Sequence, residues 1–117
     1  LAMLKDNVTA AVDGIQLSER DMDVLKGYAR SNRSLYCQGC MRCESVMGAD
    51  TRIPDVLRFM MYYNSYAKTD DARRLFRELP DHVKNGLASR DYSPAEDVCP
   101  NRIEIGRLMR EAAVMLA

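Results

Sequence analysis

Four cysteines constrain this chain more than any other feature of its sequence. Cys37, Cys40 and Cys43 form a C-x2-C-x2-C run, and Cys99 lies far downstream, directly before Pro100. Cysteines this close in sequence do not readily form disulfides with one another, whereas their thiolates can turn toward a common centre. The spacing therefore predicts a site in which all four thiolates hold one metal centre.

The same spacing matches part of the bacterial ferredoxin motif, C-x2-C-x2-C-x3-C-P, whose last cysteine binds the other cluster when two clusters are present. The run that begins at Cys37 supplies three cysteines of one motif, and Cys99-Pro100 supplies the end of a second. The four remaining ligand positions carry Met47, Ser89, Tyr92 and Ala95. One complete ligand set beside one wholly missing set predicts a single four-iron–four-sulfur (4Fe-4S) cluster. Its ligands would be Cys37, Cys40, Cys43 and Cys99.

Two other interpretations of the cysteines stay open at this stage. Four thiolates can also bind zinc, although structural zinc motifs usually pair two short knuckles instead of grouping three cysteines and one. The thiols can also stay free of metal. Near the run, Tyr36, Met41 and Met47 are candidates to shield a bound centre, and Arg42 is a candidate to offset its negative charge. Ordinary packing or solvent exposure is the more common role of such side chains.

Composition and motifs limit the other classes of function. The 17 basic residues balance the 17 acidic residues, so no charge excess indicates nucleic acid or a membrane surface as a partner. No apolar run reaches the roughly 20 residues that a membrane-spanning helix needs. The single histidine, His82, is expected at the surface, and no catalytic triad, phosphate-binding glycine loop or carboxylate metal set appears. No catalytic residue is assigned, and electron transfer is the chemistry left to this segment.

The hydrophobic pattern predicts an all-α fold, a small bundle of about five helices with an irregular cysteine loop at residues 35–52. Ser18 and Asp21 form a capping-box pattern at the start of one helix, and Pro54 suits the first turn of another. Ser93 is expected to cap a short helix whose first residue is Pro94. The expected helices cover residues 3–12, from 18 through 29 with fraying near 31–34, from 54 onward, 69–80, a short segment from 93, and 102–116.

The cysteine run and its surroundings resemble the C-terminal ferredoxin-like domain of bacterial oxidoreductases of the aldo/keto reductase type. The resemblance is carried by residues 36–43, 53–63, 72–80 and 99–105, while residues 3–11 are similar to the last helix of the preceding barrel. It implies a helical bundle of the α-helical ferredoxin type. It also implies that residues 1–34 are linker helices after an N-terminal (β/α)8 barrel and that residues 35–117 form the iron–sulfur domain.

The resemblance further implies a function for the chain as part of a larger enzyme. The barrel would bind NAD(P) and hold the catalytic residues, and the domain would pass electrons between it and an unidentified donor or acceptor. The expected location is the cytoplasm, or the periplasm where the full-length protein carries a twin-arginine signal. The alternative is a structural role, in which a metal-stapled or metal-free helical domain docks on a partner.

Overall fold

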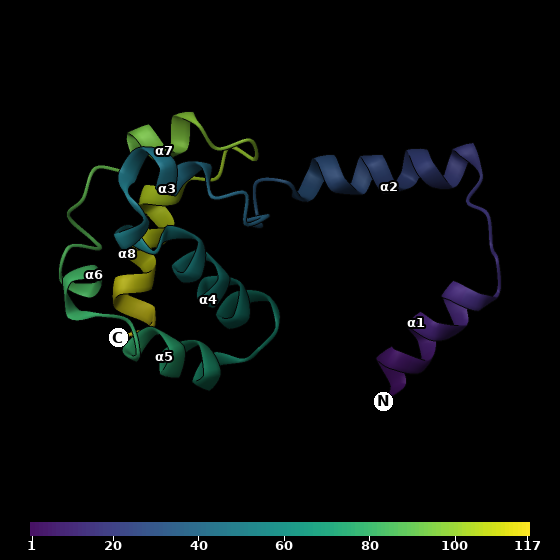
Figure 1. The fold of residues 1–117 in the computed structure, drawn as a ribbon, viewed down its shortest axis with the longest axis horizontal. Helices are drawn as coiled ribbons and strands as arrows, with labels where there is room; N and C mark the ends of the chain where they lie inside the picture. Colours follow the sequence, from purple (N-terminus) through teal and green to yellow (C-terminus); the bar gives the residue numbers. More distant parts are fainter. The chain divides into compact units, whose positions relative to one another are not determined.

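The computed structural model describes residues 1–117, and all of its regular elements are helical (Figure 1). The predicted all-α fold is confirmed, with more and shorter helices than the expected five or so. Contacts divide the chain into two units, Leu1–Ser31 and Asn32–Ala117, called the first and second unit below. The elements are α1 (Ala2–Val12), α2 (Glu19–Asn32), α3 (Arg42–Met47), the 3-10 helix η1 (Ala49–Thr51), α4 (Ile53–Ser65), α5 (Thr69–Arg77), α6 (Asp81–Asn85), α7 (Ser93–Asp97) and α8 (Ile105–Met115).

The first unit consists of α1 and most of α2, and neither helix contains a buried residue. The predicted capping box at the start of α2 is confirmed. The backbone N–H of Ser18 donates to Asp21 Oδ2 at 2.9 Å, and the N–H of Asp21 donates to Ser18 Oγ at 3.2 Å. The Ser18 hydroxyl also donates to Asp21 Oδ2, at 2.7 Å, and this bond together with that of the Ser18 N–H lowers the pKa of the Asp21 carboxyl. The assignment of this unit as a linker after a barrel stays a prediction.

The second unit holds the hydrophobic core, which is built mainly from α4, α5 and α8. Helix α4 packs against α5 and α8, and α7 packs against α3 and α8. Figure 1 shows α8 running through the middle of this unit. Because each helix buries one face against its neighbours, the core residues recur at helical spacing. They include Ile53, Val56 and Met60 of α4, Ala72 and Phe76 of α5, Val83 of α6, Ala95 of α7, and Ile105, Met109 and Ala112 of α8.

The cysteine segment is more regular than the sequence predicted. An irregular loop over residues 35–52 is wrong for residues 42–47 and 49–51, which form α3 and η1. Met41 takes a left-handed conformation with φ 62°, and its carbonyl oxygen accepts the backbone N–H groups of Glu44 and Ser45. The packing of α3 against α7 stabilises a helix too short to be stable alone.

The start of α7 also differs from the prediction. Tyr92, not Ser93, occupies the N-cap position, and the helix itself begins at Ser93. The Asp91 carboxylate accepts hydrogen bonds from the Ser93 N–H at 3.0 Å and from its hydroxyl at 2.7 Å. Asp91 therefore satisfies the donors of Ser93 itself, while the N–H groups of Ala95 and Glu96 inside the helix donate to the Tyr92 carbonyl.

Glu96 connects α7 to the first turn of α8, where Gly106 N–H donates to its Oε1 at 2.8 Å. Because this bond satisfies a donor that has no partner within its own helix, Glu96→Ala is expected to lower the free energy of unfolding by about 1–2 kcal/mol. Urea denaturation monitored by circular dichroism measures this loss. The matched control is Glu78→Ala, which removes an exposed glutamate paired with Arg74 and is expected to cost about 0.5 kcal/mol or less. Equal losses in the two variants would contradict a capping role for Glu96.

Candidate functional site

All four cysteines border one hollow in the second unit, called the cysteine hollow below. Its empty space is about 330 Å³, part of which is open to solvent. No cysteine takes part in a disulfide, so all four thiols are available to bind. The remaining lining is mostly apolar and consists of Gln38, Met41, Leu57, Pro100, Asn101, Ile103 and Ile105.

Contacts between short helices bring the distant cysteine to the run. Cys43 lies in the first turn of α3, and Cys99 lies two residues after the end of α7, where its N–H donates to the Glu96 carbonyl at 3.1 Å. Because α3 packs against α7, residues far apart in sequence meet at the hollow. Two further bonds join the same segments: the Arg33 guanidinium donates to the Pro100 carbonyl, and Asn101 Nδ2 donates to the Tyr36 carbonyl at 2.9 Å.

The four thiols differ in their access to solvent. Cys43 is only 8% exposed, Cys37 and Cys99 are half-buried, and Cys40 is exposed. A centre held by these residues would have its most protected ligand at Cys43 and its most accessible ligand at Cys40.

Burial raises the pKa of the Cys37 and Cys43 thiols, because the charged thiolate loses solvation in the hollow. Hydrogen bonds from backbone N–H groups act in the opposite direction, and that of Gly39 donates to Cys37 Sγ at 3.4 Å. Charge on Cys40 or Cys99 raises the pKa of Cys37 further. Ligation needs the deprotonated form, so a metal centre that binds here must displace thiol protons, and binding weakens as the pH falls.

No group of three or more His, Cys, Asp or Glu side chains in the chain is arranged so that it could hold a metal ion. The identity of a bound centre stays a prediction from the spacing of the cysteines.

The predicted neighbours of the centre fall in different places. Met41 lines the hollow, whereas Met47 is half-buried and packs against the core. Tyr36 is exposed, and its carbonyl, not its ring, has the contact with Asn101. Arg42 is exposed and does not line the hollow. Of the proposed shielding side chains, Met41 alone lies at the site.

Sequence reasoning missed the apolar wall and a nearby arginine. Leu57, Ile103 and Ile105 line the hollow, and the helical spacing of Leu57 within α4 and of Ile105 within α8 was the signal for two of them. Arg58, the next residue in α4, lies beside Cys37 at a second, smaller hollow. Its position depends on how α4 packs against the cysteine run, which the sequence does not encode locally.

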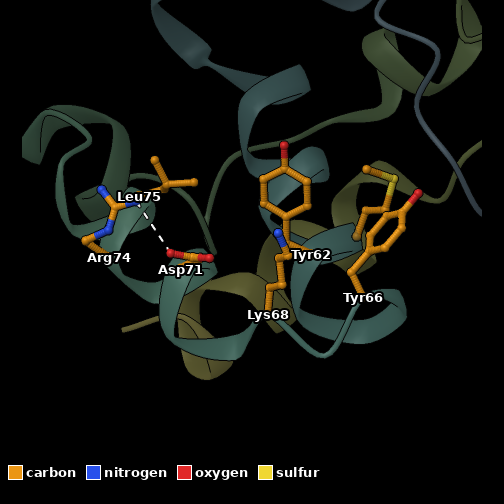
Figure 2. Close-up of a pocket in the computed structure, with 7 residues that line it drawn as sticks. Tyr62, Tyr66, Lys68, Asp71, Arg74 and Leu75 are labelled. Carbon is orange, nitrogen blue, oxygen red and sulfur yellow. Dashed lines mark ion pairs between the residues drawn. The ribbon is translucent and has the colours of Figure 1, made fainter. Parts of the chain in front are cut away.

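A separate hollow of about 870 Å³ opens at the turn from α4 to α5 (Figure 2). The Tyr62 and Tyr66 rings meet edge to face there, with centroids 6.3 Å apart. Arg74 and Asp71 form an exposed ion pair at 3.6 Å on its other side. No cysteine lines it, so it is distinct from the cysteine hollow.

No protein-family model, curated protein or solved structure matches this chain. The resemblance to oxidoreductases of the aldo/keto reductase type therefore stays a prediction, and the function has to be argued from the site. None of the helices combines the length and the apolar character that crossing a bilayer requires. The single histidine, His82, is exposed as expected.

Proposed function

We propose that the second unit is an iron–sulfur electron-transfer domain that binds one 4Fe-4S cluster through Cys37, Cys40, Cys43 and Cys99. The observation that carries this proposal is the shared hollow, which is bordered by all four cysteines and by no other thiol or histidine. When bound, such a cluster accepts and releases single electrons. The 3+1 grouping of the cysteines and the Pro after Cys99 favour the cluster over zinc.

The residues around the hollow fit this role. Leu57, Ile103 and Ile105 are buried and exclude water from one side of the site. The Gly39 N–H donates to Cys37 Sγ, the kind of hydrogen bond that stabilises negative charge on a ligand sulfur. Exposed Cys40 leaves one edge accessible, and an electron donor or acceptor needs such an edge.

The interior of the second unit supports one cluster and not two. Tyr92 and Ala95, at two of the ligand positions that lack cysteine, are core residues, and the Tyr92 hydroxyl donates to the Leu87 carbonyl at 3.0 Å. Met47 packs against the same core, and Ser89 is exposed. Ordinary packing accounts for the three residues that lie in or against the core.

We further propose that this domain serves an NAD(P)-dependent oxidoreductase of the aldo/keto reductase type, as the sequence resemblance implies. Its partners would be the barrel of the same enzyme and a separate electron donor or acceptor. A second candidate function is structural. Cys43 and Cys99 lie on separate segments, so a centre bound by both would also cross-link α3 to the chain after α7 and restrain the unfolded state.

Metal analysis tests the cluster directly. Anaerobic purification of the chain is expected to give a brown protein with about four iron atoms and four acid-labile sulfides, because one cluster is the full capacity of the four cysteines. The control is a variant with all four cysteines replaced by Ser, prepared in parallel, which is expected to bind neither. A colourless product with one zinc per chain would contradict the proposal.

The relay and structural roles are separated by redox behaviour at constant fold. For a relay, dithionite reduction and reoxidation change the absorption and electron paramagnetic resonance spectra reversibly, and they alter catalysis by the full-length enzyme. If catalysis is the same in both redox states, the structural role is the correct one.

A further inference from the structure

We propose that the Arg58 guanidinium raises the reduction potential of the cluster by stabilising the negative charge that reduction adds. This inference rests on the proposed cluster and deepens it by assigning a tuning residue outside the ligand set. Arg58 is not a ligand of the cluster. It would act on the charge of the cluster through space, and it is therefore a positioning residue.

The position of Arg58 beside a ligand is the first observation. Arg58 and Cys37 border the same hollow, whose empty space is about 260 Å³. Leu57, the preceding residue of α4, lines both this hollow and the cysteine hollow. Arg58 and Cys37 are therefore neighbours across this hollow.

The absence of a competing carboxylate is the second observation. Arg52, at the start of the same helix, pairs with Asp55 at 2.6 Å, and Arg74 on α5 pairs with Glu78 at 2.8 Å. Arg58 has no ion pair or hydrogen bond with another residue. Its charge is not neutralised locally and acts on whatever negative charge lies at Cys37.

The sign of the effect follows from the charge balance of reduction. A one-electron reductant such as dithionite gives one electron to the cluster, no bond is made or broken at a ligand, and the net negative charge of the centre grows by one. A nearby cation favours the more negative state, so Arg58 shifts the equilibrium toward the reduced form. Because Arg58 is exposed, dissolved salt screens the interaction and reduces the shift.

The structure separates Arg58 from the arginine that the sequence favoured. Arg42 lies inside the cysteine run but lines neither the cysteine hollow nor the hollow beside it. Arg42 is therefore the arginine nearest to the cysteines in sequence, whereas Arg58 is the arginine that borders a cysteine in the fold.

The test is a redox titration of the cluster-loaded 117-residue chain, followed by electron paramagnetic resonance. Arg58→Gln is expected to lower the equilibrium constant for reduction about three- to tenfold, where tenfold corresponds to a shift of about −59 mV for one electron. Arg58→Lys keeps the charge and is expected to stay within twofold of the unmodified chain. The matched control is Arg77→Gln, which removes one charge from an exposed position of α5 that borders no cysteine and should leave the potential unchanged. High salt should narrow the difference between Arg58→Gln and the unmodified chain.

The possible failures point to different conclusions. An unmodified chain without a cluster would overturn the proposed function itself. A cluster-loaded Arg58→Gln variant with an unchanged potential would overturn the role of Arg58 and leave the cluster standing. If Arg58→Gln loses its iron, Arg58→Met replaces it in the titration. Loss of iron from both variants would also overturn the tuning role, because Arg58 would then be needed for assembly.

Discussion

Replacing Cys99 by Ser is expected to remove most of the iron and sulfide from the anaerobically purified chain and to lower its thermal stability. Cys99 is the one proposed ligand outside the cysteine run, so a centre bound by all four thiolates would connect the run to the segment after α7. Because binding free energy at a metal centre is also folding free energy, loss of the centre lowers the melting temperature. Iron and sulfide assays, together with thermal denaturation under anaerobic conditions, measure both effects.

The control for Cys99→Ser is Ser89→Ala, at a ligand position of the missing set. Ser89 is exposed and borders no part of the cysteine hollow, so its replacement is expected to leave iron content and stability unchanged. If Cys99→Ser also changes neither quantity, the cysteines bind nothing and the second unit is a metal-free helical module.

Met109→Ala is expected to destabilise the second unit strongly. Met109 is 0% exposed in the middle of α8, where it packs into the core of the second unit. Truncation removes buried apolar contacts and leaves a cavity, which costs about 2–5 kcal/mol of the free energy of unfolding. Urea denaturation of the two purified chains measures the difference.

The control for Met109→Ala lies on the same helix. Val114 is 80% exposed, and Val114→Ala is expected to change the free energy of unfolding by less than about 0.5 kcal/mol. Similar losses at both positions would mean that α8 is not buried as the structure has it.

Helix positions were predictable where the signal is local. The capping box of Ser18 and Asp21 depends on residues three apart, and Pro54 marks a first helical turn wherever the rest of the chain lies. The last helix was expected from residue 102 but begins at Ile105, because Arg102 takes a left-handed conformation with φ 50°. The existence of α3 could not be predicted, since its six residues are stabilised by packing against α7.

The spacing of the cysteines predicted which thiols the candidate site contains, but it did not predict the side chains around them. The ferredoxin motif indicated Cys99 as the fourth cysteine of the site, and in the structure Cys99 borders the same hollow as the run. The wall residue Ile105 and the neighbouring cation Arg58 could not be selected in this way. Their positions depend on how α8 and α4 pack in three dimensions, and the sequence next to each residue does not predict that packing.

The interior position of Tyr92 makes the single ligand set difficult to extend by substitution. Tyr92 is 3% exposed, and Ala95 is completely buried one turn later. Exchanging Tyr92 for Cys would leave a void where its ring stands, and a larger side chain at Ala95 would crowd a closely packed interior. Cysteines at Tyr92 and Ala95 would therefore disturb the core, by a void at the first position and by crowding at the second. A second cluster in this unit would therefore need a core redesigned around it.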